Sequence, residues 1–162
     1  MIILALGTNM GDRFNQLHRA RQKIGAFFNI RHCSDIYETA PQYLTNQPMF
    51  LNAVMAGETA LSPLDLLRAC KHVEKELGRT TAPRFGPRCI DVDVVMYGDA
   101  VMQCDELILP HPRMHERGFV LHPLCDILPN IMHPIHQKTI ADMCHELAAS
   151  DPGKKISWPP ST

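Results

Sequence analysis

The 162-residue chain is long enough for one domain with a hydrophobic core and too short for two. Apolar residues make up 45% of it and charged residues 20%, which is typical of a soluble globular protein. The formal net charge of −1 argues against a general nucleic-acid binder, so any cationic site is expected to be local. No apolar run approaches the ~20 residues that cross a bilayer. The chain starts without the basic segment of a secretory leader. Its six cysteines include no CxxC pair. These features predict a cytoplasmic monomer with reduced thiols, small-molecule substrates, and neither nucleic acid nor membrane as a partner.

The first 38 residues are predicted to form a strand, a helix and a second strand. Residues 2–6 are an apolar run that stops in a turn, where Asp12 can cap the next helix. Apolar side chains then recur every three or four positions, which predicts an amphipathic helix over 13–28, and a strand follows over 30–38. The turn lacks the Lys-Ser/Thr that a P-loop requires, which excludes a Walker-type nucleotide site.

A long loop and a strand come next. Residues 39–49 contain prolines, glutamines and an asparagine, and loops of this length in compact domains are often functional. A strand is predicted over 50–59, with Phe50 and Asn52 on the same face. An amide beside an aromatic ring can read the edge of a flat heterocycle; the alternative is an asparagine that faces solvent near the strand end.

A second helix and a second long loop follow. Ser62 and Pro63 have the residue types of an N-cap and a first helical position, and Gly78 ends the apolar periodicity. The polar side of this helix includes Lys71 and Glu74. The loop 79–88 is rich in arginine, proline and glycine.

The stretch 89–97 is predicted to be a strand in which two acids share one face. Its residues are mostly β-branched or apolar, with glycine-containing turns on both sides. Side chains alternate along a strand, so Asp91 and Asp93 are expected to leave the same face only ~6–7 Å apart. The other face is expected to carry the apolar residues of the pattern, which are Ile90, Val92, Val94 and Met96.

Two like charges this close favour a bound cation or an added proton. Mg²⁺ is the expected occupant, because it prefers carboxylate and phosphate oxygens. Arg84 and Arg88 lie just before the acids, and guanidinium groups beside a carboxylate-bound metal suit a polyphosphate. The alternative is a surface strand whose two acids pair with these arginines.

The order of elements, β-α-β-β-α-β, predicts an α+β fold of the ferredoxin-like type, with an antiparallel sheet and both helices on one of its faces. A small hairpin is expected over 100–110, with short helices over 114–124 and 140–148. Residues 1–149 are expected to form a single domain, and 150–162 a C-terminal tail.

Several motifs in register resemble the family of 6-hydroxymethyl-7,8-dihydropterin pyrophosphokinases. The strand signature of that family, arginine-x-x-aspartate-aliphatic-aspartate followed by two aliphatics, is satisfied between Arg88 and Val95. The segments LGTNMGD, YETAP, FLNAV and LPHPRMHERGFVLHPL are similar to further blocks of the family in the same order. The resemblance covers roughly residues 1–130.

The resemblance implies transfer of the terminal pyrophosphate of ATP to the hydroxymethyl group of the pterin, releasing AMP, as a step of folate biosynthesis. Asp91 and Asp93 would hold two Mg²⁺ ions bridging the phosphates. The expected catalytic residues are Arg79, Arg88 and Asp93, and Asp93 is the only candidate for a general base. The expected pterin-binding residues are Thr39, Ala40, Gln42, Phe50, Asn52 and Phe119. The expected ATP-binding residues are Lys71, Glu74, Arg84, Val94, His111 and Arg117.

The chain departs from the family pattern at three side chains. Glu106 stands where relatives can have arginine, Phe85 where they can have tryptophan, and Phe50 where they can have tyrosine. The last two replacements keep an aromatic ring. The loop between Arg79 and Arg88 is about one residue shorter than in some relatives, which bears on the role of Arg84.

Three alternatives compete with this interpretation. Nine histidines invite a zinc site, but a proline lies within the spaced pairs at 111–115 and 133–136. A glycosyltransferase or phosphohydrolase could also use the DxD acids to hold a metal, without needing a pterin. A ferredoxin-like fold can also serve as a binding module without catalysis.

Overall fold

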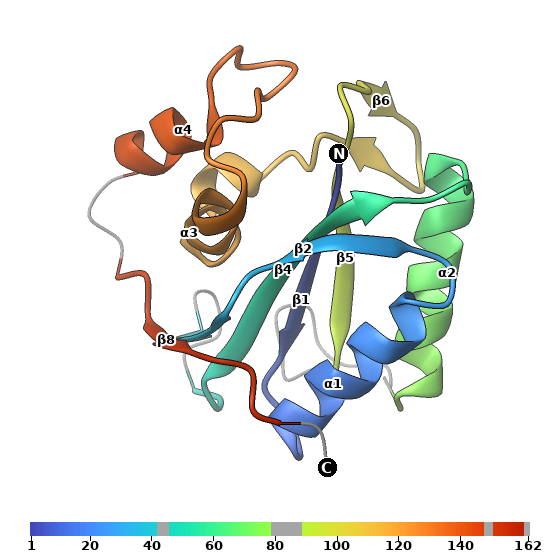
Figure 1. Cartoon of the computed structure of the whole chain (residues 1–162), viewed down its shortest axis with the longest axis vertical. Helices are drawn as coiled ribbons and strands as arrows, with labels where there is room; N and C mark the ends of the chain where they lie inside the picture. Colours follow the sequence, from blue (N-terminus) through green and yellow to red (C-terminus); the bar gives the residue numbers. More distant parts are fainter. Residues whose placement is uncertain (42–45, 79–88, 148–150, 161–162) are drawn as a thin grey trace.

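The structure, a computed structural model, is built on a six-stranded antiparallel sheet (Figure 1). It describes residues 1–41, 46–78, 89–147 and 151–160. The order of the sheet is β5-β1-β4-β3-β8, and β2 also pairs with β4. The strands are β1 (Ile2–Thr8), β2 (Asn29–Cys33), β3 (Ile36–Thr39), β4 (Phe50–Glu58), β5 (Asp91–Tyr97) and β8 (Lys154–Ile156). The predicted site residues outside the described part are Gln42, Arg79, Arg84 and Arg88.

Helices cover both faces of this sheet (Figure 1). α1 (Arg13–Ile24) and α2 (Pro63–Glu76) pack on one face, as the predicted β-α-β-β-α-β order requires. The other face carries α3 (Gly118–Ile127) and α4 (Ile140–Glu146), preceded by the 3₁₀ turn η1 (Met114–Glu116). The predicted hairpin is present as β6 (Met102–Gln103) and β7 (Ile108–Leu109). No helix in the described ranges is long and apolar enough to span a membrane.

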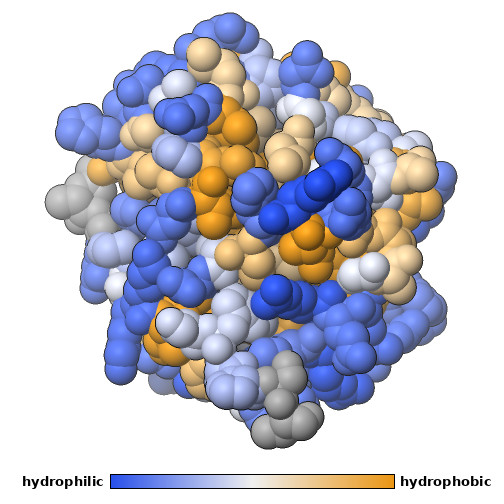
Figure 2. Space-filling model, in the orientation of Figure 1, coloured by the Kyte–Doolittle hydropathy of each residue, from blue (hydrophilic) through white to orange (hydrophobic). Residues whose placement is uncertain are grey.

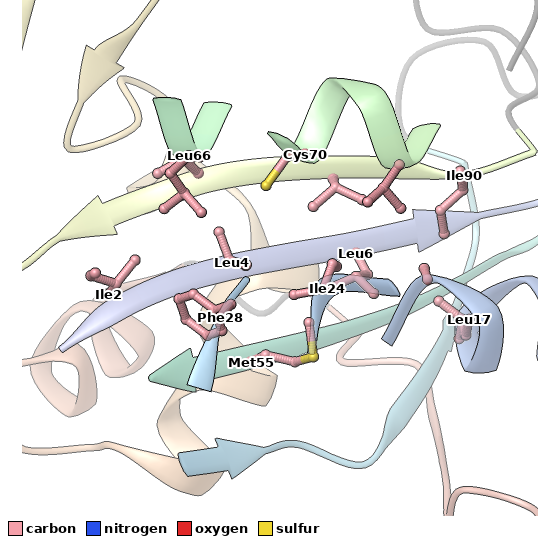
Figure 3. Packing of buried hydrophobic residues seen from close by; sticks show 14 of the residues in the cluster. Ile2, Leu4, Leu6, Leu17, Ile24, Phe28, Met55, Leu66, Cys70 and Ile90 are labelled. Atoms are coloured by element: carbon pink, nitrogen blue, oxygen red, sulfur yellow. The ribbon is translucent and has the colours of Figure 1, made fainter. Parts of the chain in front are cut away.

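The two faces of the sheet have separate hydrophobic cores. Figure 3 shows the larger core, in which the apolar side of β1 meets α1 and α2; labelled members include Leu4, Leu17, Phe28 and Leu66. The second core lies between the sheet and α3/α4. On the face shown in Figure 2, apolar surface is broken into small patches among hydrophilic residues. The second core occupies only part of its sheet face, and the rest of that face is left for polar side chains.

The predicted helix starts are confirmed. The Asp12 side chain accepts a hydrogen bond from the Asn15 amide at 3.1 Å, and Ser62 caps α2 with Pro63 in its first turn. α1 ends at Ile24, four residues earlier than predicted, and Phe28 is nevertheless buried in the larger core.

β5 contains a bulge that corrects one predicted side-chain direction. Asp93 pairs with Ala5 and Val94 with Leu4, but Met96 pairs with Ile3, so Val95 is an extra residue. Val92 and Val94 lie in the larger core as predicted, whereas Met96 belongs to the second core. The prediction that Met96 shares their face is therefore wrong, because the bulge reverses the alternation.

The C-terminal residues add a strand that the sequence analysis did not predict. β8 pairs with β3 in the register Tyr37↔Lys155. Beyond it, the Trp158 Nε1 donates to the Ser34 carbonyl at 2.8 Å, and its ring meets His18 edge-on at 5.3 Å. The domain boundary at 149/150 stays a prediction, and these are the contacts that a truncation there would remove.

Trp158→Ala is expected to lower the free energy of unfolding by about 2 kcal/mol, because the ring is half-buried against α1 and anchors β8. Urea denaturation followed by circular dichroism measures this change. Trp158→Phe is the matched control, since it keeps an aromatic ring and loses only the Nε1 bond. Equal midpoints for Trp158→Ala and the wild type would contradict the anchoring role.

Candidate active site

The candidate site begins with a row of residues that crosses the sheet on its α3 face. Gly7 in β1 lies opposite both Asn52 in β4 and Asp91 in β5. Directly paired residues in antiparallel strands point to the same face, so Asn52 and Asp91 flank Gly7. A Cβ atom on Gly7 would lie 3.0 Å from the Asn52 Oδ1. Glycine at this position therefore admits the buried amide.

Asp93 lies one row further along β5, opposite Ala5, on the same face as Asp91. Burial raises the pKa of the Asp93 carboxyl well above its ordinary range, and the charge of Asp91 raises it further. Lys71 and Arg117 oppose this rise, while Glu74 adds to it. The predicted pair of carboxylates thus exists as a partly desolvated, mutually repelling pair, which a divalent cation would neutralise.

Glu74 supports the strand that carries the acids. β5 is an edge strand of the sheet, and the Val92 amide donates to the Glu74 Oε1 at 2.8 Å. The same oxygen meets the Lys71 Nζ at 3.2 Å. The side chain of Val94 is buried in the larger core, so a nucleotide contact at that position would have to come from its backbone. The ATP-binding roles of Lys71, Glu74 and Val94 stay predictions.

His111 lies close to the bulge of β5 and to the acids. Its amide donates to the Val95 carbonyl at 2.8 Å, and its Nδ1 accepts from the Arg113 amide at 3.1 Å. Burial lowers the pKa of His111 to about 4, helped by Arg117 and Arg113 and opposed by Asp91. At neutral pH the ring is therefore uncharged, and because Nδ1 is an acceptor, Nε2 carries the proton. Such a ring can donate to a phosphate oxygen.

Arg117 stands at the start of α3 and reaches toward the same region. Its guanidinium lies 5.5 Å from the centre of the Phe119 ring. Its charge affects the pKa of both Asp93 and His111. Its Nε is buried without a hydrogen-bond partner in the described part of the chain. A buried donor of this kind suits an anionic ligand.

The predicted pterin residues come from three elements that meet at one end of the sheet. The Asn52 Nδ2 donates to the Thr39 Oγ1 at 2.7 Å, and Thr39 pairs with Phe50 across β3 and β4. Phe50 is two residues from Asn52 and so shares its face. Ala40 is exposed just after β3, and Phe119 is half-buried in the first turn of α3.

Two polar residues near the site were missed by the sequence analysis. The Asn9 Nδ2 donates to the Gln47 Oε1 at 2.9 Å and to the Pro48 carbonyl at 3.0 Å. Arg13 donates to the Met49 carbonyl at 3.1 Å and to Glu38 at 2.8 Å. These bonds hold the segment just before Phe50. Asn9 follows an apolar strand and precedes Gly11, a pattern typical of turns, and nothing in it points to a partner almost 40 residues away.

One departure from the family pattern has a structural counterpart. Glu106 is exposed and meets the Arg68 side chain of α2 at 3.4 Å. The carboxylate is thus turned to a neighbouring cation at the hairpin.

The donor set fits magnesium. Within the described ranges, no group of three or more His, Cys, Asp or Glu side chains is placed to hold a metal ion. Mg²⁺ in a phosphate-transfer site needs only one or two carboxylates, because phosphate and water oxygens complete its shell. Asp91 and Asp93 supply that number, and a bound cation would offset the burial and the repulsion from Asp91 that raise the pKa of Asp93.

Comparison with known proteins assigns the family. The family model for 7,8-dihydro-6-hydroxymethylpterin-pyrophosphokinase (HPPK) matches residues 3–129. The chain belongs to the HPPK family. It is 40% identical over 141 residues to the Aquifex aeolicus 2-amino-4-hydroxy-6-hydroxymethyldihydropteridine pyrophosphokinase, covering 87% of this chain and 88% of that protein. It is 41% identical over 146 residues to the Schizosaccharomyces pombe folic acid synthesis protein fol1, covering 89% of this chain.

The matched relatives differ in length. The chain spans 20% of the S. pombe fol1 protein, and 28% of the mitochondrial folate synthesis bifunctional protein of Arabidopsis thaliana. A solved Plasmodium falciparum HPPK-DHPS variant superposes with a TM-score of 0.73 at 16% identity, covering 90% of this chain and 43% of that one. This likeness confirms the predicted fold. The predicted family is confirmed by the family model and the Aquifex relative.

Asp93→Asn is expected to raise the stability of the metal-free protein at pH 8 by about 1–2 kcal/mol. Because the folded-state pKa of Asp93 lies above its unfolded value, the folded wild type loses stability as pH rises from ~4 through the folded-state pKa. The neutral amide removes that loss. The gain should be near zero at pH 4 and full at pH 8.

Urea unfolding at both pH values, in EDTA, measures this difference. Asp99→Asn, on the exposed turn after β5, is the matched control and should change little. A destabilised Asp93→Asn protein at pH 8 would show that the carboxylate makes favourable contacts in the metal-free fold.

Proposed function

We propose that this chain transfers the terminal pyrophosphoryl group of ATP to the hydroxymethyl group of 6-hydroxymethyl-7,8-dihydropterin, with Mg²⁺ bound by Asp91 and Asp93, and releases AMP. The observation that carries the proposal is the cross-sheet row of Asn52, Gly7 and Asp91. Adjacent strands are ~4.8 Å apart, so the ring-reading amide and the first carboxylate lie about 10 Å apart across Gly7. A bicyclic pterin can occupy that span, with its hydroxymethyl group directed to the acids.

The pterin half of the site combines stacking with edge recognition. Phe50 and Phe119 are proposed to enclose the flat ring, each adding about 0.5–1.5 kcal/mol beyond the area that it buries. Asn52, held by its bond to Thr39, has a fixed orientation, so its amide oxygen can accept from the ring without a loss of rotamer freedom. Ala40 and Gln42 are proposed to add contacts from the loop.

The phosphate half neutralises charge from several sides. Bound Mg²⁺, proposed as two ions held by Asp91 and Asp93, would supply electrostatic stabilisation of the polyphosphate. His111 is proposed to donate through Nε2, and Arg117 through its unpaired Nε, to phosphate oxygens. Lys71 and Glu74, both on α2, lie beside the outer edge of β5. The arginines expected to complete the site are Arg79, Arg84 and Arg88.

The proposed pyrophosphoryl transfer does not require a strong general base. The nucleophile is a primary alcohol and the electrophile is the β-phosphorus of ATP, so in-line positioning and charge neutralisation dominate the rate. Asp93 is the candidate general base because its carboxylate shares the face of β5 with Asp91, beside the proposed path of the alcohol. It is proposed to receive the proton of the alcohol as the new P–O bond forms.

We also propose that the chain works as a cytoplasmic monomer. Its net charge of −1, and apolar patches that hydrophilic residues separate on the face of Figure 2, support this proposal.

AMP is expected to form only when ATP, Mg²⁺ and 6-hydroxymethyl-7,8-dihydropterin are all present, in equal amount to the pterin pyrophosphate. Chromatography of the nucleotide products tests this. Omission of the pterin is the control for hydrolysis. ADP or free phosphate as the main product would instead favour the phosphohydrolase alternative.

Asp91→Asn and Asp93→Asn are each expected to lower kcat by at least ~10³-fold, because each removes a charged ligand of the metal. Steady-state kinetics over a range of Mg²⁺ concentrations measures the loss, with circular dichroism to verify the fold. Asp99→Asn again serves as the control. Turnover near that of the wild type in either variant would remove that residue from the metal site.

A further inference from the structure

A network of three polar residues lies at the edge of the sheet that is opposite to β5, the strand of the acids. The Tyr37 hydroxyl in β3 donates to the Asp126 Oδ2 at the end of α3. The Lys155 Nζ in β8 meets the same carboxylate oxygen at 2.9 Å and lies 5.9 Å from the centre of the Tyr37 ring. The network therefore joins the sheet, α3 and the C-terminal strand.

This network is continuous with the candidate site through the sheet register. Lys155 pairs with Tyr37, Tyr37 with Asn52, Asn52 with Gly7, and Gly7 with Asp91. The five residues form one row on the α3 face, with the network at one end, the carboxylate pair at the other, and Asn52 between them.

Asp126 is also aligned with the aromatic residue of α3. Phe119 and Asp126 are seven positions apart, which is two helical turns, so both project from the same side of the helix, about 10 Å apart along its axis. Phe119 packs against the second core, and Asp126 binds Tyr37. The Tyr37–Asp126 bond thus holds the C-terminal end of α3 to β3, two helical turns from Phe119.

The hydrogen bond, and not the ion pair, carries the energy of this contact. The side chains of Lys155 and Asp126 are 51% and 37% exposed, so their ion pair contributes little. Tyr37 is 5% exposed, and burial followed by the bond to Asp126 raises the pKa of its hydroxyl far above the physiological range. The hydroxyl therefore stays protonated and donates. A buried donor that loses its charged acceptor is left unsatisfied, which costs free energy.

We propose that Tyr37 and Asp126 are positioning residues for the pterin: their bond sets the height of α3 above the sheet, and with it the width of the slot between Phe119 and Asn52. This inference rests on the proposed function, because it takes Phe119 and Asn52 as pterin contacts. Neither Tyr37 nor Asp126 has to touch a substrate. Two strands, β1 and β4, separate the acids of β5 from Tyr37, so substitutions at Tyr37 or Asp126 are not expected to affect those acids.

Tyr37→Phe and Asp126→Ala are expected to weaken pterin binding by about 5–10-fold each, less than the full effect of a charge-assisted hydrogen bond because the bond acts on the ligand only through α3. The probe is 6-hydroxymethylpterin, titrated by calorimetry in the presence of Mg²⁺ and α,β-methylene ATP, which cannot be cleaved between its α and β phosphorus atoms. The Kd of the nucleotide analogue, measured alone, should stay within about twofold of the wild type. Purely structural damage would not produce this split between the two ligands.

The matched controls are Lys155→Gln, which removes only the exposed ion pair, and Glu58→Gln, which removes an exposed pair on another strand. Both should leave the pterin Kd within about twofold of the wild type. The double variant Tyr37→Phe/Asp126→Ala should bind the pterin as weakly as either single variant, because both remove the same bond.

The outcomes separate this inference from the proposed function. A wild-type protein that binds no pterin and forms no AMP would overturn the proposed function itself. A wild type that is active, with pterin affinities in both single variants within about twofold of it, would overturn the positioning role alone. Additive losses in the double variant, or equal losses for pterin and nucleotide, would overturn it as well.

Discussion

Two carboxylates held on one face of an edge strand are the constraint on which the rest of the site depends. Asp91 and Asp93 cannot relax away from each other, because β5 is anchored to β1 on one side and by the Glu74–Val92 bond on the other. Their repulsion and partial burial favour a proton or a cation over two free charges. The fold thus carries an electrostatic cost at rest that binding of a cation and a polyphosphate would offset. Such an arrangement is expected of a ligand-binding site, in which repulsion between charged groups lowers the stability of the ligand-free fold.

The division of the sheet into two faces explains how the fold tolerates this cost. The face under α1 and α2 has a continuous apolar core that includes Ile2, Leu4 and Leu6 of β1. The face under α3 and α4 is apolar only where α3 and α4 cover it. The row from Asp91 through Gly7 to Asn52 lies on that second face, with Asp91 half-buried and Asn52 buried. Stability comes mainly from one side of the sheet, and the ligand-binding chemistry is placed on the other.

Local patterns in the sequence predicted much of this arrangement, and the reasons for the failures are physical. Strand alternation placed Asp91 and Asp93 on one face, and cap residues placed the starts of α1 and α2, because these features depend on near neighbours. The direction of Met96 was wrong, because a bulge depends on the register with β1, which the local sequence does not contain. The bonds from Asn9 and Arg13 to residues 47–49, and the pairing of β8 with β3, join segments far apart in the chain. The positions of Gln42, Arg79, Arg84 and Arg88 lie outside the described residues, so their roles still depend on the family resemblance.

The same bulge links the strand of the acids to the residues that follow it. The inserted residue, Val95, accepts a hydrogen bond through its carbonyl from the His111 amide at 2.8 Å. That bond brings the segment after the hairpin back against β5, so His111 and, through η1, Arg117 lie within electrostatic range of Asp91 and Asp93. A regular strand would have kept its alternation and directed Met96 to the larger core. The contact at the bulge therefore brings His111, and Arg117 at the start of α3, close to the two carboxylates of β5.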